Sequence, residues 1–519
     1  MKKPATAAVT PGVAPGLRRY LYLTASVTGA AIMIVEILGA RMLAPYVGTS
    51  HFVWTAQIAV TLVALAAGYA AGGWLADRRP RLAWLYACLI AGAAYLGLSV
   101  ICCEQVAYYC LRFRLALGSL LAASILFLPP LALMAMTGPF LVRMLTISLS
   151  KVGTSMGRLT SVSTMGSVCG TILIGYVLLP FFSNSSVMWL TSIALVVVAV
   201  GYFIGWERKG APPAVTAGIV ALAVGWVGVV QPHDGLSENL VELYRGNSHF
   251  GMLQVVENKE ADRRFYLNDF LTQNTYDPVR GRSLSLFTYM LHDLAQGYSR
   301  KVQDVLCIGL GVGIVPMRFA KEGVRVDAVE INPDVVPLAT KYFGFDPAKV
   351  NLTIGDGRYF LNSTPRQYDA IVLDAFLGES PPSHLMSREA FASMKARLKP
   401  GGALVMNVFG DFEPGRDYFV ASVEKTLRSA FRSVHIHAAG NGNVFLVGSE
   451  EPDLRLLRPL DYSTMPEAVQ EMARTAIQSD LHSDPAHGQV LLDDYNPVDY
   501  FDALNREELR KRLALSYRP

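Results

Sequence analysis

The chain has 519 residues, of which 52% are hydrophobic and 17% are charged. An ordinary soluble domain has roughly 25% charged residues, so this composition excludes a disordered chain and argues against a purely soluble one. The net charge of +4 is small and scattered along the chain, which gives no basic footprint for nucleic acid. The length predicts about three domains.

The composition changes once along the chain. Charges are sparse and apolar runs are long between Tyr20 and Val230, whereas the composition from Gln231 to Pro519 is ordinary. We therefore predict a transmembrane helical domain over residues 1–231, a linker with a small β-unit over 232–300, and a Rossmann-like domain with a C-terminal tail over 301–519.

The first part is predicted to be a multi-pass helical membrane domain. A membrane helix needs about 20 apolar residues. About seven segments meet this requirement: 20–40, 55–76, 83–103, 116–145, 160–182, 187–206 and 212–230. Pro129 and Pro130 predict a kink in the fourth segment. The fifth segment is predicted to be a packed inner helix, because small residues let helices approach closely in a membrane. Its glycines are Gly157, Gly166, Gly170 and Gly175.

The positive charges predict an orientation in the inner cell membrane. Basic residues gather at the N-terminus (Lys2, Lys3, Arg18, Arg19) and at three further places that fall on the same side of the predicted spans, namely 78–81, 143–158 and 208–209. This bias places the N-terminus in the cytoplasm. Seven spans would then put the C-terminal half outside. If segment 212–230 lies in the interface or re-enters, that half returns to the cytoplasm, so its side stays open.

Glu36 lies inside the first predicted span, with Arg41 five residues on. A carboxylate within a membrane is a candidate functional group. Two interpretations are open: a structural ion pair with Arg41, or a contact with a substrate or lipid headgroup.

The second half alternates predicted strands and helices. After antiparallel segments at 251–257 and 264–268, buried strands are predicted at 302–308, 325–329, 351–354, 368–373 and 403–408. Helices are predicted from about 314, from 332 to about 342, and over 387–398. This rhythm predicts a parallel, doubly wound α/β sheet.

Glycines and carboxylates follow the carboxyl ends of these predicted strands, where such sheets bind ligands. They are Gly309, Gly311 and Gly313 after the first strand, Glu330 after the second, Asp356-Gly357 after the third and Asp374 after the fourth. Glu330 can accept hydrogen bonds from ribose hydroxyls, and Asp356 can accept one from an exocyclic amine such as adenine N6. The Asp-Gly step favours an S-adenosyl nucleoside over NAD. No metal is predicted, because no Cys or His has ligand spacing.

Residues 245–410 resemble the spermidine/spermine synthase family, the polyamine aminopropyltransferases. The resemblance lies in Ser248-His249-Phe250 with Leu253 and Val255, in Asp269-Phe270-Leu271-Thr272-Gln273, in the Gly309–Gly313 loop, in Val329-Glu330-Ile331-Asn332, in Asp356-Gly357 and in Asp374. With the apolar half attached, the chain resembles membrane-fused bacterial spermidine synthase-like proteins. The resemblance implies a Rossmann-like fold of the methyltransferase type, with Gln273, the glycines, Glu330, Asp356 and Gly357 binding decarboxylated S-adenosylmethionine.

The chain departs from that family on the acceptor side. The family's loop aspartate is replaced by Val312, the second Asp of its Asp-x-x-Asp by Leu377, and its amine-holding residues by Ser285-Leu286 and Tyr289-Met290-Leu291. The resemblance therefore covers the nucleoside side and leaves the acceptor open, with either a small-molecule amine or a lipid as candidate.

Aminopropyl transfer needs a base that accepts the amine's proton. We expect Asp374 to be that base and Tyr289 to help orient the amine. Glu379 is a candidate substitute for the missing second Asp, and His384 is expected to be a loop hydrogen-bonder. Asp493 and Asp494 are expected to be solvated in a polar tail, or to close over the cleft.

Three functions remain open from the sequence. The first is a membrane-anchored spermidine synthase-like aminopropyltransferase. The second is an S-adenosylmethionine-dependent methyltransferase-like enzyme acting on a membrane-delivered substrate. The third is a transporter or nucleoside-binding sensor. The oligomeric state is also open, with a homodimer as one option.

Overall fold

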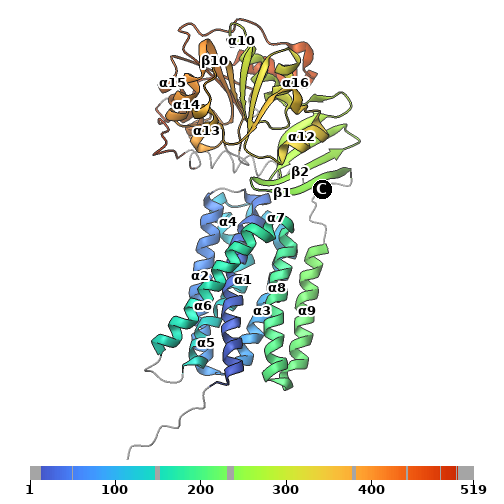
Figure 1. The fold of residues 1–519 in the computed structure, drawn as a ribbon, viewed down its shortest axis with the longest axis vertical. Coiled ribbons are helices and arrows are strands. Elements are labelled where there is room, and N and C mark those ends of the chain that lie inside the picture. Colours follow the sequence, from blue (N-terminus) through green and yellow to red (C-terminus); the bar gives the residue numbers. More distant parts are fainter. Residues whose placement is uncertain are drawn as a thin grey trace, which may run out of the picture. The chain divides into compact units, whose positions relative to one another are not determined.

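The computed structural model describes residues 13–48, 51–146, 152–230, 239–376, 381–439, 442–479, 481–484, 486–497 and 500. Contacts divide the chain into two compact units, Met1–Asp234 and Gly235–Pro519, coloured blue to green and green to red in Figure 1. A division of the second unit at residue 300 stays a prediction.

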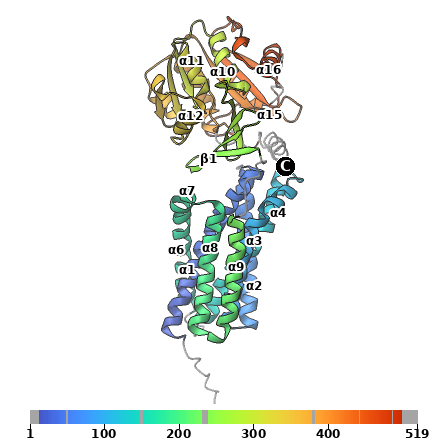
Figure 2. The same cartoon turned by 90° about the vertical axis from the view of Figure 1, so that its right-hand side faces the viewer.

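The first unit consists of helices. They are α1 (Pro15–Val47), α2 (His51–Arg78), α3 (Leu82–Cys110), α4 (Leu115–Ala135), α5 (Thr137–Leu145), α6 (Val152–Leu173), a π-helical turn (Ile174–Leu178), α7 (Leu179–Phe181), α8 (Asn184–Trp206) and α9 (Ala211–Val230). In the described residues they form seven segments long and apolar enough to cross a membrane, including Arg208–Val230. Figure 2 shows α1, α8 and α9 running side by side along the bundle.

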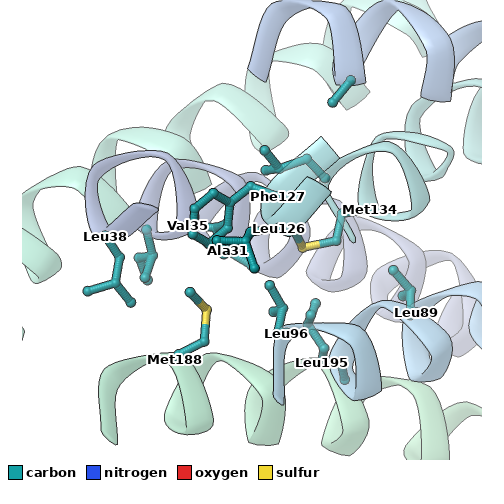
Figure 3. Close-up of a cluster of buried hydrophobic side chains, with 14 of the residues drawn as sticks. Ala31, Val35, Leu38, Leu89, Leu96, Leu126, Phe127, Met134, Met188 and Leu195 are labelled. Atoms are coloured by element: carbon teal, nitrogen blue, oxygen red, sulfur yellow. The ribbon is translucent and has the colours of Figure 1, made fainter. Parts of the chain in front are cut away.

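The core of this unit is aliphatic. Figure 3 shows buried side chains that α1, α3, α4 and α8 contribute to this core, among them Phe127, which is fully buried. The helix of Phe127 continues through Pro129 and Pro130, ends at Ala135, and is followed by α5. The predicted kink thus corresponds to a break at Met136, past the prolines.

Helix α6 packs tightly on one neighbour only. A Cβ atom added at Gly166 would lie 2.1 Å from the carbonyl oxygen of Ser26, and one at Gly170 would lie 2.6 Å from that of Ala30, so these glycines allow the backbones of α6 and α1 to touch. Gly157 and Gly175 face open space, and 22% of the span's most apolar window is buried. The predicted close packing is therefore confirmed at Gly166 and Gly170, but the prediction of an inner helix is wrong, because α6 buries only the face that meets its neighbours.

The expected ion pair between Glu36 and Arg41 is not formed. Within the described residues no salt bridge joins them, and the hydrogen-bond partner of Glu36 is Thr61 on α2. Side chains five positions apart on a helix do not share a face, so Glu36 and Arg41 point in different directions. A residue on a neighbouring helix can lie directly opposite the carboxylate.

The second unit begins with an antiparallel sheet of five strands in sequence order: β1 (Leu240–Ser248), β2 (Gly251–Asn258), β3 (Arg263–Asn268), β4 (Leu271–Asp277) and β5 (Arg282–Ser283). The segments predicted at 251–257 and 264–268 correspond to β2 and β3. Strand β1 occupies residues that the sequence did not predict as a strand. The predicted linker lies mostly in 231–238, outside the described residues.

The larger sheet has seven strands in the order β11-β12-β10-β9-β6-β7-β8. The strands are β6 (Asp304–Ile308), β7 (Arg325–Glu330), β8 (Asn351–Ile354), β9 (Tyr368–Leu373), β10 (Leu398–Phe409), β11 (Ser433–Ala438) and β12 (Asn443–Ser449). The first five are parallel, and β12 runs antiparallel to β10. This is the Rossmann-like, methyltransferase-type architecture predicted for the C-terminal part.

Helices cover both faces of this sheet. One hydrophobic cluster packs α10 (Leu286–Tyr298), α11 (Ile314–Lys321) and α16 (Glu467–Gln478) against it. The opposite cluster contains α13 (Gly357–Ser363), α14 (Arg388–Ala396) and α15 (Tyr418–Ala430). Helix α12 (Val335–Phe343) also packs against the small sheet. The order of strands reverses between β6 and β9, which is where sheets of this kind bind their ligands.

Candidate active site

A cavity of about 230 Å³ opens at the carboxyl ends of the parallel strands. Its lining includes Gly309 after β6, Glu330 at the end of β7, Asp356 after β8 and Asp374 after β9. The strand-end residues picked out from the sequence therefore surround one space, because parallel strands finish at the same edge of a sheet.

The glycine loop is shaped by close backbone contacts. Gly309 has a φ of +93°, and a Cβ atom there would lie 2.2 Å from the carbonyl oxygen of Asp374, so no larger residue fits without a shift. Gly309 and Gly311 both line the cavity, whereas Gly313 does not. Gly313 instead packs under Phe345 at the start of α11.

Glu330 is fixed by main-chain amides. The Leu310 N–H donates to one carboxylate oxygen at 2.9 Å, and the Asn332 N–H donates to the other at 2.8 Å. Burial raises the pKa of Glu330, an effect that these backbone hydrogen bonds oppose. Each oxygen keeps a lone pair, so the carboxylate can still accept hydrogen bonds from a ligand in the cavity.

Asp356 caps α13 and contacts a histidine. Its Oδ1 accepts from the Tyr359 N–H at 2.8 Å, and its Oδ2 lies 2.8 Å from Nε2 of His384. Burial raises the pKa of Asp356, but the hydrogen bonds from Tyr359 and His384 together lower it below its ordinary value. His384 therefore acts in the structure as the loop hydrogen-bonder that was expected, and it also lines the cavity.

Asp374 is the end of a chain of side-chain hydrogen bonds across three strands. The amide of Asn407 on β10 donates to Asp374 Oδ1 at 3.1 Å, and the amide of Asn443 on β12 donates to Asn407 Oδ1 at 3.0 Å. Burial raises the pKa of Asp374 to about 6, against a smaller lowering by the Asn407 hydrogen bond. A carboxylate with this pKa is suited to accept a proton near neutral pH.

The two remaining predicted residues differ in position. Gln273 on β4 lines the cavity. Tyr289 does not: its hydroxyl donates to the Ser283 carbonyl at 2.9 Å, and its ring lies under the Arg318 guanidinium at 4.6 Å. The structure therefore does not bring Tyr289 to the cavity, and its neighbour Thr288 lines the wall instead. The reason is helical rotation, since successive residues at the start of α10 point about 100° apart.

Part of the cavity lining was not predicted from the sequence. Asn407 lies at the carboxyl end of a predicted strand, so the rule that selected Asp374 could have found it. Four phenylalanines also line the cavity: Phe250, Phe287, Phe376 and Phe409. These phenylalanines lie far apart along the chain, so no sequence motif indicates that they line one cavity. Leu377 and Glu379 lie outside the described residues, and the role considered for Glu379 stays a prediction.

The C-terminal tail is anchored at Asp493, whose side chain is also 44% exposed, as expected. The Arg358 guanidinium donates to both carboxylate oxygens of Asp493 at 2.6 Å, and the Ser387 hydroxyl donates to one of them. Arg358 directly follows the Asp356-Gly357 step, so this ion pair holds the tail beside the part of the cavity that Asp356 and Gly357 line. Asp493 itself does not line the cavity. Asp494 is exposed, as expected.

This fold defines a Rossmann-like domain of the methyltransferase type with a cavity at the carboxyl ends of its parallel strands. Residues 285–439 match the spermine/spermidine synthase domain. A polyamine aminopropyltransferase of Vibrio vulnificus is 39% identical over 118 residues, which cover 22% of this chain and 40% of that protein. An N-terminal histidine N-methyltransferase of Emericella nidulans is 32% identical over 162 residues, covering 30% and 28%. The solved spermidine synthase from Thermotoga maritima aligns with a TM-score of 0.37 and 18% identity, over 45% of this chain and 84% of that one.

The similarity to the spermine/spermidine synthase family thus lies in residues 285–439. The chain spans less than half the length of either curated relative named above. The matched domain contains Glu330, Asp356 and Asp374, and the helical unit lies outside it.

Proposed function

We propose that the protein is a membrane-anchored transferase that moves an aminopropyl group from decarboxylated S-adenosylmethionine to an amine. The observation that supports this most is the placement of Glu330, Asp356 and Asp374 around one cavity at the strand ends. In this proposal Glu330 binds the ribose, Asp356 binds the adenine amine, and Asp374 faces the reacting end of the nucleoside. Gln273 and the glycines complete the nucleoside site.

The proposed reaction is an in-line displacement. The acceptor nitrogen forms a bond to the methylene carbon next to the sulfonium, the carbon–sulfur bond breaks, and its electron pair goes to sulfur to give methylthioadenosine. Asp374 takes the proton that the new secondary ammonium releases. Holding the two reactants in line can lower the barrier by about 7–11 kcal/mol, and the base adds about 10²–10⁴-fold.

The charges of the cavity favour the decarboxylated nucleoside. Among the described residues that line it there is no Lys or Arg, so no cationic side chain is available there to pair with the carboxylate of intact S-adenosylmethionine. Decarboxylated S-adenosylmethionine does not require such a partner.

A methyltransferase is the second candidate. It is favoured by the replacement of the family's loop aspartate with Val312, whose side chain is buried among Leu253, Val255 and Tyr266 and cannot hold the aminopropyl ammonium. In that reaction the acceptor attacks the methyl carbon, and S-adenosylhomocysteine is the leaving group.

The leaving group distinguishes the two reactions. The intact protein, purified in detergent, is incubated with either nucleoside and with putrescine, other amines or lipids, and the products are identified by mass spectrometry. Methylthioadenosine with an aminopropylated amine supports the proposal. S-adenosylhomocysteine with a methylated product supports the second candidate, and turnover of neither nucleoside contradicts both.

A further inference from the structure

The helical unit contains a cavity of about 750 Å³ that the proposed reaction does not use. It is lined by residues 25–33 of α1, 65–77 of α2, 134–135 of α4, 137–143 of α5 and 156–167 of α6. These are the middle of α1, the second half of α2, most of α5 and the middle of α6, with the charged end of the cavity at Asp77 near the end of α2 and Arg143 near the end of α5. The cavity therefore lies toward one end of the bundle, beside the seam where α6 touches α1.

The length of the cavity matches one leaflet of a bilayer. Its wall on α2 runs from Leu65 to Asp77, which at about 1.5 Å per residue is about 18 Å. Half of a hydrocarbon core of about 30 Å is about 15 Å. The exposed surface of the wall is mostly apolar, with Ile32, Met33 and Met134 among its residues, and hydroxyl side chains of α1 and α6 also line it: Thr28, Thr160, Ser163, Thr164 and Ser167.

The two charged residues that line the cavity in the described part of the chain lie at its end. Arg143 on α5 and Asp77 on α2 form an ion pair at 3.4 Å, and their side chains are 59% and 74% exposed. Arg78 and Arg79 follow directly, so this end is the level at which polar headgroups would lie. A guanidinium and a carboxylate side by side complement a ligand with adjacent phosphate and ammonium groups.

Between the charges and the aliphatic wall lies an unsatisfied hydroxyl. Thr137 lines the cavity and is 3% exposed, and its Oγ1 has no hydrogen-bond partner among the described residues. A buried hydroxyl without a partner is costly, and rotation of the Thr137 side chain toward the cavity would let it donate to an ester carbonyl of a ligand. By contrast, Thr191 on α8 is similarly buried outside the cavity, and it donates to the Val187 carbonyl at 2.9 Å.

We propose that this cavity binds one phospholipid whose headgroup contains a phosphate and a primary ammonium. The phosphate lies at Arg143, the ammonium at Asp77, a glycerol ester carbonyl at Thr137, and one acyl chain along α1, α2 and α6. The inference rests on the membrane location in the proposed function, but it does not depend on the transferase reaction.

The test measures bound lipid rather than turnover. The intact protein is delipidated in detergent and mixed with phosphatidylethanolamine, phosphatidylcholine or phosphatidylglycerol, and retained lipid is counted by native mass spectrometry. We expect one phosphatidylethanolamine per chain, retained at least about fivefold better than the other two lipids. Equal retention of all three, or no retention, would overturn the proposal.

Variants locate the site. A Cβ atom at Gly138 would make an ordinary contact of 3.7 Å with Tyr69, so Gly138→Leu adds bulk inside the cavity, whereas Gly205→Leu adds it on α8 in open space. We expect Gly138→Leu to lose the lipid and Gly205→Leu to keep it.

Thr137→Val should weaken retention of the lipid, whereas the control Thr191→Val should not. The exposed Asp77→Asn does not perturb the core, and it should remove the preference for the primary ammonium over phosphatidylcholine. If Gly138→Leu, Thr137→Val and Asp77→Asn all retain the lipid as the wild type does and keep its preference for the primary ammonium, the assignment is contradicted.

Discussion

The amide of Asn407 donates a hydrogen bond to the carboxylate of Asp374 at 3.1 Å, across two neighbouring parallel strands. Asn407 is in turn held by Asn443, so the carboxylate that faces the cavity has a fixed orientation. This relationship makes the proposed role of Asp374 testable in several independent ways.

The first prediction concerns the proposed base. Asp374→Asn keeps the shape of the side chain but cannot accept a proton, so turnover should fall by about 10² or more while nucleoside affinity stays within a few-fold. Steady-state kinetics and calorimetry measure the two quantities. The matched control is Asp453→Asn, whose side chain is 84% exposed and outside the cavity, and which should leave both unchanged. Turnover that persists in Asp374→Asn would assign the base elsewhere, and Glu379 would be changed next.

The second prediction concerns pH. Burial raises the pKa of Asp374 to about 6, so the base is protonated below that value, and kcat should decline as the pH falls through about 6. The Asn407 hydrogen bond lowers the pKa, so Asn407→Leu should raise it and move the acidic limb to higher pH. Asn362→Leu, on the exposed side of α13, is the control. An acidic limb that stays in place in Asn407→Leu would show that Asn407 does not position or tune the base.

The third prediction concerns the pH dependence of stability, and it follows from the raised pKa of Asp374. The ordinary pKa of an aspartate is 3.8, so between about pH 4 and 6 the folded protein binds more protons at Asp374 than the unfolded chain does. The contribution of Asp374 to the free energy of unfolding is therefore present at about pH 4 and is lost as the pH rises through about 6. Asp374→Asn removes this loss, so its Tm should exceed that of the wild type at about pH 7.5 and approach it at about pH 4. The same Tm difference at both values would be inconsistent with a raised pKa.

The fourth prediction concerns nucleoside binding. Glu330→Gln removes the charge and one of the two acceptors that hold the Leu310 and Asn332 amides. Affinity for the nucleoside should fall at least tenfold, about 1.4 kcal/mol, as measured by calorimetry. Glu471→Gln, on an exposed position of α16, should bind as the wild type does. An unchanged affinity in folded Glu330→Gln would remove the ribose assignment.

The fifth prediction concerns the glycine loop. Gly309→Ala places a Cβ atom against the Asp374 carbonyl in a backbone conformation that L residues rarely adopt, which should cost at least about 1–3 kcal/mol of stability and weaken nucleoside binding. Gly323→Ala has a similar φ of +78° but open space around it, so it isolates the backbone cost from the clash. Equal losses in both variants would argue against the close approach of the loop to β9.

The sequence by itself determined where the strands of the large sheet end. Buried parallel strands are continuous apolar runs, so the polar residues that follow them stand out, and parallel pairing brings those ends together. Gly309, Glu330, Asp356 and Asp374 could therefore be predicted as one site. The seven apolar segments could be predicted for a similar reason, because their length and composition are set by local sequence.

The tertiary structure decided what depends on neighbours far apart in the chain. Tyr289 turns away from the cavity because its hydroxyl finds the Ser283 carbonyl, and Asn443 reaches the site only through the antiparallel pairing of β12 with β10. Helix α6 makes its closest backbone contacts with α1, and it lines the cavity whose wall also includes Thr137 of α5. Sequence periodicity fixes which face of an element is apolar, but it does not fix which partner covers that face, since the partner is chosen by packing of the whole chain.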